Sequence, residues 1–329
     1  MALPADADAY LTVLSDQLAG KLTQFEQPAN LYEPIRYILK LPAKRARPLL
    51  VYLGYRWHNP SGDFRSILPL ATAIELFHNF TLVHDDIMDH APSRRGQPTI
   101  HTLWNTDTGI LAGDAMLILA YRHLTDLASH NRFAELLSYF HQVALRVCEG
   151  QVFDLEQAQA QSVSLEQYIE MIRLKTAVLL GGSLAMGALV AGADPEQMSH
   201  LQTLGEQAGI AFQLQDDYLD LYAEESAFGK LSGGDIIEKK KNILWIIAYA
   251  HSDSDSRNEM IQRMQADDND HEKIEWFRLL YHNLGVQDEA LKLIRTWFEA
   301  ARLHLEQFST PDQRVPLAAF LDQLENRKH

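Results

Sequence analysis

Residues 76–89 form an apolar stretch with helical spacing that ends in three carboxylates, Asp85, Asp86 and Asp89. On a helix, Asp85 and Asp89 stand one turn apart on one face, and Asp86 is rotated from Asp85 by about 100°. The same spacing recurs at the end of another mostly apolar run, at Asp216, Asp217 and Asp220. One such cluster is usually a solvated helix end, but two copies predict a pocket in which the carboxylates hold cations.

The chemistry of these oxygen ligands favours magnesium. Magnesium binds hard oxygen donors and usually retains waters, so one or two carboxylates and the phosphates of a substrate complete its coordination. The pair of aspartate clusters therefore predicts a diphosphate substrate.

Helical periodicity recurs along the 329 residues, and no run alternates as a strand would. We expect an all-α fold, a large helical bundle, with residues 1–329 as one domain because no Gly/Ser or Pro-rich linker interrupts them. The uncharged run 177–193 is at the lower length limit for a membrane span. A helix that is apolar all round is also typical of the centre of a soluble bundle, which we favour, and its glycines would allow close helix approach.

Charge and cysteine content exclude several classes of protein. The net charge of −15 and the pI of about 5.3 argue against a nucleic-acid or anionic-membrane surface. A single cysteine, Cys148, allows no intrachain disulfide, and the N-terminal residues show no secretory signal pattern. We expect a cytoplasmic protein without a transmembrane segment.

Two basic turns flank the first aspartate cluster. The turn 41–48 carries Lys44 and Arg47, which form either a solvated loop or a clamp for an anion. The turn 91–98 places Arg94 and Arg95 beside the carboxylates. Arginines beside acids usually form salt bridges, but next to a metal cluster they would also make a pyrophosphate site.

Further polar residues interrupt the apolar helices. Gln151 and Asp154 are one turn apart and either contact a metal or lysine or are ordinary polar positions. Lys175 enters an apolar run and needs an anionic partner. The glycine-rich stretch 228–236 contains Lys230 but lacks Walker spacing, so we interpret it as a cationic lid over phosphates.

From Lys44 to Lys241 the chain resembles the trans-isoprenyl diphosphate synthases, also called polyprenyl synthetases, with the motifs in that family's order. The resemblance implies ten or more helices around a central cavity, usually a homodimer, and three magnesium ions held by Asp85, Asp86, Asp89, Asp216, Asp217 and Asp220. It also implies an isopentenyl diphosphate site of Lys44, Arg47, His78 and Arg95. An allylic diphosphate would contact Arg94, Lys175, Lys230 and Lys240, while Thr176 and Gln213 would line the cavity beside the developing cation.

Two positions depart from the family pattern. Pro42-Ala43 replaces the usual glycine pair, and Asn242 stands where a threonine is common. Both leave the charged groups in place.

Phe80 is our candidate for setting product length. It lies five residues before Asp85, and we expect it on the same side of the helix, where an aromatic residue resembles the floor of short-chain enzymes. With small Thr81 beside it and no two-residue insertion in the first motif, the resemblance favours geranylgeranyl diphosphate, with farnesyl or longer-chain diphosphates as alternatives. Phe80 could instead be an ordinary core aromatic.

Three other functions compete with this interpretation. A terpene cyclase would not need the second diphosphate site of Lys44, Arg47 and Arg95. A regulatory subunit would be expected to lose aspartates, and all six are present. A di-iron bundle would use the pair Glu75 and His78, but a second such pair is missing.

Overall fold

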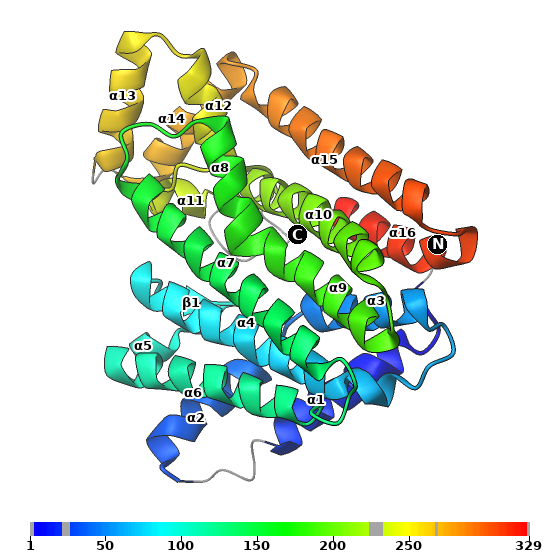
Figure 1. Cartoon of the computed structure of the whole chain (residues 1–329). Coiled ribbons are helices and arrows are strands. Elements are labelled where there is room, and N and C mark those ends of the chain that lie inside the picture. The colour runs from blue at the N-terminus through cyan, green and yellow to red at the C-terminus, as the bar shows by residue number, and fades with distance from the viewer. Residues whose placement is uncertain (1–2, 22–26, 224–232, 267–268, 328–329) are drawn as a thin grey trace. The chain divides into compact units, whose positions relative to one another are not determined.

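The computed structural model describes residues 3–21, 27–223, 233–266 and 269–327. These residues are almost entirely helical, which confirms the predicted all-α fold (Figure 1). One small departure is an antiparallel hairpin, in which β1 (Ser93–Arg94) pairs with β2 (Gln97–Pro98). Strands of two residues are too short to give an alternating pattern, so the sequence could not predict them.

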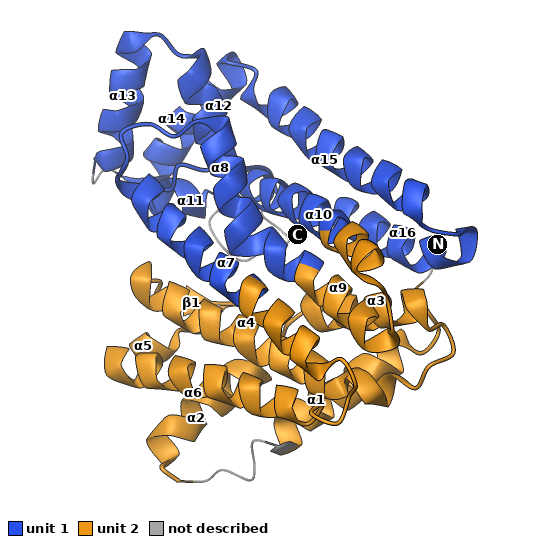
Figure 2. Cartoon of the chain, in the orientation of Figure 1, with its two compact units in different colours: residues 1, 143–181, 203–329 blue, residues 2–142, 182–202 orange. Residues whose placement is uncertain are grey.

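The chain divides into two compact units, which Figure 2 colours separately. Unit 2 comprises Ala2–Gln142 and Gly182–Gln202, and unit 1 consists mainly of Val143–Gly181 and Thr203–His329. The expectation of one domain stays a prediction.

Unit 2 contains these elements: α1 (Ala7–Lys21), α2 (Ala29–Lys40), α3 (Ala46–His58), the 3₁₀ turn η2 (Phe64–Ile67), α4 (Leu68–Met88), the hairpin, α5 (Ile100–Leu103) and α6 (Thr106–Thr125). Unit 1 contains α8 (Leu165–Ile172), the π-helical turn η3 (Arg173–Ala177), α11 (Gly234–Ile237), α12 (Ile243–His251), α13 (Ser254–Gln265), α14 (Asp270–Asn283), α15 (Val286–Phe308) and α16 (Pro311–Glu325). The unit boundaries fall within α7 (Phe133–Gln159), α9 (Val178–Ala191) and α10 (Pro195–Tyr222).

The two helices with aspartate clusters begin at local capping signals. The Asp63 carboxylate accepts a hydrogen bond from the Arg65 amide at 3.0 Å and starts the turn that leads into α4. The Asp194 carboxylate accepts from the Gln197 amide at 2.9 Å and starts α10. Both caps depend only on residues that are close in sequence.

Glycines allow α3 and α9 to pack with their backbones in contact. A Cβ atom at Gly54 would lie 2.0 Å from the Leu184 carbonyl oxygen, and one at Gly187 would lie 2.0 Å from that of Val51. Larger residues would force the helices apart. The expected close approach at the uncharged run is therefore confirmed for Gly187.

Two helical stretches are long and apolar enough to cross a membrane, Phe64–Met88 and Leu165–Ala191. The sequence analysis had singled out only part of the second. In the most apolar window of each, 67% and 83% of the residues are buried inside the protein. Such burial is typical of core helices and weighs against a membrane span.

Candidate active site

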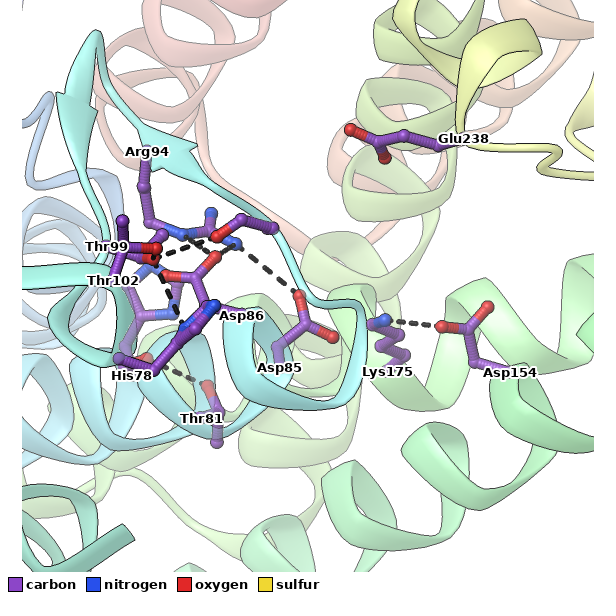
Figure 3. A network of polar contacts seen from close by, with 12 residues as sticks. His78, Thr81, Asp85, Asp86, Arg94, Thr99, Thr102, Asp154, Lys175 and Glu238 are labelled. Atoms are coloured by element: carbon purple, nitrogen blue, oxygen red, sulfur yellow. Dashed lines mark hydrogen bonds and ion pairs between the residues drawn. The ribbon is translucent and has the colours of Figure 1, made fainter. Parts of the chain in front are cut away.

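The first aspartate cluster lies at the C-terminal end of α4 and is held by the hairpin arginine. Arg94 Nε donates to Asp86 Oδ1 at 2.7 Å, and Arg94 Nη2 lies 3.5 Å from Asp85 Oδ2 (Figure 3). Asp86 is buried, Asp85 is partly buried, and Asp89 is the exposed C-cap. Burial raises the pKa of Asp86, and the Arg94 guanidinium opposes that shift. The prediction that the turn 91–98 places an arginine beside these carboxylates is confirmed for Arg94.

The position of this cluster at the end of α4 leaves its negative charge poorly compensated. The C-terminal end of a helix carries partial negative charge, which disfavours carboxylates there and favours cations. The last turn of α4 contains no basic residue, so its own sequence does not offset the three aspartates. Arg94 supplies one positive charge, and a metal ion would supply more.

The basic turn before α3 is fixed by a buried carboxylate. Arg45 adopts a left-handed conformation with φ of 49° and precedes α3. Its guanidinium donates to Glu75 Oε1 and, at 2.6 Å, to the Leu39 carbonyl oxygen. Glu75 is 1% exposed and also accepts from Asn79 Nδ2 at 3.0 Å. Glu75 therefore serves as the counter-ion of the turn rather than as the iron ligand of the di-iron alternative.

Arg47 and His78 meet on one side of this turn. The Arg47 Nη1 atom lies 2.9 Å from His78 Nε2, and because arginine can only donate, the histidine nitrogen accepts. Burial, and then the positive charges of Arg47, Arg95, Arg94 and Arg45, hold the pKa of His78 well below its usual value. His78 is therefore neutral at physiological pH.

Two guanidinium nitrogens in this group have no hydrogen-bond partner among the described residues. They are Arg47 Nε and Arg95 Nη1, and both atoms are buried. Burial lowers the pKa of Arg47 to about 10, with the Glu75 charge opposing and the Arg95 charge adding to the shift. Buried donors of charged groups are costly when unsatisfied, so this arrangement favours a bound anion. Lys44, also predicted for this site, is exposed in the same turn.

The predicted orientation of Phe80 is wrong. Five residues on an α-helix turn through about 500°, so Phe80 and Asp85 point about 140° apart. The Phe80 ring packs instead against His84 at 4.8 Å and Phe77 at 5.6 Å between centroids. Thr81, one turn before Asp85, shares its side of α4, and its hydroxyl donates to the His78 carbonyl oxygen at 2.8 Å (Figure 3).

In the second cluster, Asp217 is committed to hydrogen bonds within unit 1. Its carboxylate accepts from the Tyr168 hydroxyl, from Gln213 Nε2 at 3.1 Å and from the Ile243 amide at 3.2 Å. Asp217 is 5% exposed, and burial, followed by the charge of Asp235, raises its pKa to about 8. These contacts make Asp217 a link between helices, and its predicted role as metal ligand stays a prediction.

Asp220 faces a further acid that the sequence analysis did not select. Asp220 Oδ2 accepts from the backbone amide of Asp235 at 3.0 Å, and Asp235 Oδ2 accepts from Asn242 Nδ2 at 2.8 Å. Burial and the Asp235 charge raise the pKa of Asp220 to about 7. Asn242 also caps α12 through the amides of Leu244 and Trp245, so the asparagine found in place of the family's threonine has a structural role.

Asp216, the remaining acid, is paired with Arg327 near the C-terminal end of the chain, at 3.0 Å. Sequence reasoning missed Arg327 because no local pattern links two residues so far apart in the chain. The signal that could have indicated it is the basic pair Arg327-Lys328 directly after the terminal helix.

Lys175 has the anionic partner that the sequence required. Its Nζ atom lies 2.6 Å from Asp154 Oδ2 (Figure 3), so of the alternatives left open for Asp154 the structure shows the lysine contact. Lys175 belongs to the π-helical turn η3, a feature frequent at functional sites. A Cβ atom at Gly150 would lie 2.2 Å from the Lys175 amide nitrogen, so only glycine lets α7 approach this turn.

The other residues predicted to contact the allylic diphosphate or to line the cavity beside the cation are partly described by the structure. The Thr176 hydroxyl donates to Gln213 Oε1 at 3.2 Å, so these two residues are brought together. Lys240 Nζ lies 2.7 Å from Glu238 Oε2. Lys230 lies outside the described residues.

Both aspartate clusters fit a hard divalent cation by their donor chemistry. Each lies near the C-terminal end of a helix whose last turn lacks a basic residue, and each holds an arginine as a positive partner. No three acidic, histidine or cysteine residues of the described ranges form a metal site by themselves. Magnesium usually completes its shell with water and phosphate. Asp85 and Asp89 in the first cluster, and Asp216 and Asp220 in the second, are the residues that would hold such ions.

Metal affinity should rise with pH. Metal binding requires the ionised carboxylate, and Asp220 has a pKa of about 7, so below that pH the ion must displace a proton. We expect the affinity for magnesium to increase from pH 6 to pH 8 and then level off. Calorimetric titration in buffers of different ionisation enthalpy would measure the affinity and the protons released; an affinity that is constant over this range would contradict the assignment.

Comparison with known proteins identifies the family of this chain. The model of the polyprenyl synthetase family matches residues 28–279. A short chain isoprenyl diphosphate synthase of Methanocaldococcus jannaschii is 35% identical over 73% of this chain and 72% of its own length. A geranylgeranyl pyrophosphate synthase of Geoglobus acetivorans is 34% identical over 96% of this chain and 97% of its own.

A solved structure of a prenyl diphosphate synthase has the same fold. The crystal structure of a geranylgeranyl pyrophosphate synthase superposes with a TM-score of 0.90 and 37% identity, covering 98% of this chain and 99% of the other.

Proposed function

This chain belongs to the polyprenyl synthetase family and is a prenyltransferase, and from that premise we propose that it makes geranylgeranyl diphosphate. It would condense isopentenyl diphosphate with an allylic diphosphate in the presence of magnesium, with three ions per active site. The observation that carries the proposal is the pair of unsatisfied guanidinium nitrogens of Arg47 and Arg95 beside His78. They would form an anion site in addition to the one beside the aspartates of α4, as two diphosphate substrates require.

The chemistry assigned to the residues follows from their charges. The carbon–oxygen bond of the allylic diphosphate breaks, and pyrophosphate leaves with the electron pair. Arg94 and Lys175 would stabilise the charge that builds on the leaving group. Magnesium, when bound to the aspartates, supplies further stabilisation of the same charge.

The allylic cation is then consumed by the second substrate. The double bond of isopentenyl diphosphate forms the new carbon–carbon bond, and a proton passes to the released pyrophosphate. Thr176 and Gln213 present only neutral dipoles, which stabilise a cation without trapping it as a nucleophilic base would.

A terpene cyclase is the second candidate, since it also ionises a prenyl diphosphate at aspartates. It has no use for the buried guanidinium pair, so the pair favours condensation. Incubating the protein with magnesium, isopentenyl diphosphate and each of dimethylallyl, geranyl and farnesyl diphosphate tests the proposal. A twenty-carbon diphosphate is the expected product. A fifteen-carbon diphosphate, or one longer than twenty carbons, would show that the protein catalyses the condensation but that the assigned product is wrong.

We expect Phe80→Ala to lengthen the product by at least one five-carbon unit. The support is the resemblance to short-chain enzymes and the partial burial of the ring, and not a position on the Asp85 side of α4. Chromatography of the dephosphorylated products gives the measurement.

The matched control is Phe77→Ala, since Phe77 is 1% exposed and packs edge-on against Phe140 at 5.4 Å between centroids. Both variants remove a ring, and only Phe80→Ala should change product length. Phe80→Ala could instead leave the product unchanged and lower only the free energy of unfolding, by part of the roughly 3–5 kcal/mol typical of a buried Phe→Ala change. The Phe80 ring would then contribute to packing only.

The proposed homodimer is supported by exposed apolar residues with helical spacing. On α6, Leu111 and Ile118 are seven residues apart and are 58% and 68% exposed. On α7, Leu145 and Val152 repeat the spacing with exposures of 64% and 51%. Such faces mark interaction sites, and the occupant we propose is a second copy of the chain, in the cytoplasm.

Light scattering coupled to gel filtration should give twice the chain mass of 37.4 kDa. The double variant Leu111→Asp/Ile118→Asp should elute as a monomer. A monomeric wild-type protein at micromolar concentration would exclude the dimer.

A further inference from the structure

The Arg327 side chain is held by several contacts with residues of α10. Its Nε donates to Gln215 Oε1 at 3.0 Å, and its Nη2 donates to the Phe212 carbonyl oxygen at 2.8 Å. The guanidinium carbon stands 3.8 Å from the centroid of the Phe212 ring. The same Nη2 lies 3.0 Å from Asp216 Oδ1. The guanidinium therefore has three contacts that do not involve Asp216.

The helix that precedes Arg327, α16, is also anchored independently. Arg302 of α15 pairs with Asp322 at 2.8 Å and with Glu325 at 2.5 Å, which holds α16 to α15. Gln215 Nε2 donates to the Glu325 carbonyl oxygen at 2.8 Å, which holds the end of α16 beside α10 (Figure 1). Arg327 should consequently keep its place when Asp216 changes partner.

The two members of the ion pair differ in exposure. The side chain of Arg327 is 9% exposed, whereas that of Asp216 is 56% exposed. Asp216 can therefore turn toward solvent or a ligand, while Arg327 is fixed.

We propose that Arg327 is a positioning residue that serves as the resident counter-ion of Asp216 and makes metal binding at the second cluster depend on diphosphate. The inference rests on the proposed function, because it takes Asp216 as a metal ligand. A bare metal ion must compete with the guanidinium for the Asp216 carboxylate. A metal ion that arrives with a diphosphate also brings phosphate oxygens. The Arg327 guanidinium can bind these oxygens when Asp216 turns to the metal, so the diphosphate replaces the ion pair that is lost.

The first cluster shows the same arrangement within unit 2. There Arg94 contacts both Asp85 and Asp86. Each aspartate cluster thus has an arginine in contact with it, and only Arg94 was foreseen from the sequence.

Titration with Mn²⁺ alone, followed by the electron paramagnetic resonance signal of the free ion, tests the proposal. Arg327→Gln should bind Mn²⁺ about three- to tenfold more tightly than the wild type, the range expected for loss of one partly exposed ion pair. Arg327→Lys retains the charge and should stay near the wild type. With inorganic pyrophosphate present, the advantage of Arg327→Gln should disappear.

Two controls make the result specific. Arg302→Gln removes an anchor of α16 without touching Asp216, so it should leave Mn²⁺ affinity unchanged even if it lowers Tm. In an Asp216→Asn background, Arg327→Gln should have no effect on Mn²⁺ affinity.

An Arg327→Gln variant that binds Mn²⁺ alone no more tightly than the wild type overturns the inference. An equal gain in the Asp216→Asn background overturns it too. Condensation by the wild-type protein is scored separately, so failure of the proposed function gives a different result from failure of this inference.

Discussion

Replacing Asp85 by asparagine should lower the turnover number for condensation by roughly a hundredfold to a thousandfold, the loss typical when one electrostatic contact to a transition state is removed. Asparagine keeps the size of the side chain but not the charge that would hold a metal ion. Asp216→Asn should have an effect of the same order. The turnover number is measured with both substrates saturating, and circular dichroism should show an unchanged helical fold.

Asp107→Asn is the matched control, because Asp107 is an exposed acid in the first turn of α6 and belongs to neither cluster. It should keep the wild-type turnover number. An Asp85→Asn variant as active as Asp107→Asn would show that Asp85 does not act in the reaction.

The second large effect concerns Arg47. We expect Arg47→Ala to raise the KM for isopentenyl diphosphate by about ten- to a hundredfold, since charge-assisted hydrogen bonds are worth about 1.5–3 kcal/mol. The KM for the allylic diphosphate should change much less, because Arg47 pairs with His78 rather than with the aspartates. Steady-state kinetics with each substrate varied in turn would give both values. Lys44→Ala, in the same turn, should act in the same direction.

Arg65→Ala provides the comparison, since the Arg65 side chain is 70% exposed and pairs only with Asp63 among the contacts described. It should change neither KM. Equal increases in both KM values for Arg47→Ala would indicate a general electrostatic role instead of a site for isopentenyl diphosphate.

Features set by neighbouring residues were predictable from the sequence. The start of α10 followed from Asp194 and Pro195, because a cap acts within one turn. Lys175 required an anion because a charge next to an apolar run must be paired, and Asp154 is that anion. The positions of Arg94, Asp85 and Asp86 followed from the short turn between them.

Features set by distant residues were not predictable. The pairing of Arg327 with Asp216 and of Tyr168 with Asp217 depends on how helices pack, which no local spacing reports. The role of Glu75 was not predictable either, because its partner Arg45 precedes α3 whereas Glu75 lies in α4. The error at Phe80 is of another kind, since helical geometry alone contradicts the expected orientation.

The most direct test of the central claim, that this chain joins two diphosphates, is incorporation of labelled isopentenyl diphosphate into a longer prenyl diphosphate. The label should enter product only when magnesium and an allylic diphosphate are both present, and a chelator should abolish incorporation. Consumption of the allylic diphosphate alone to a hydrocarbon, with no incorporation of the label, would contradict the account and favour a cyclase.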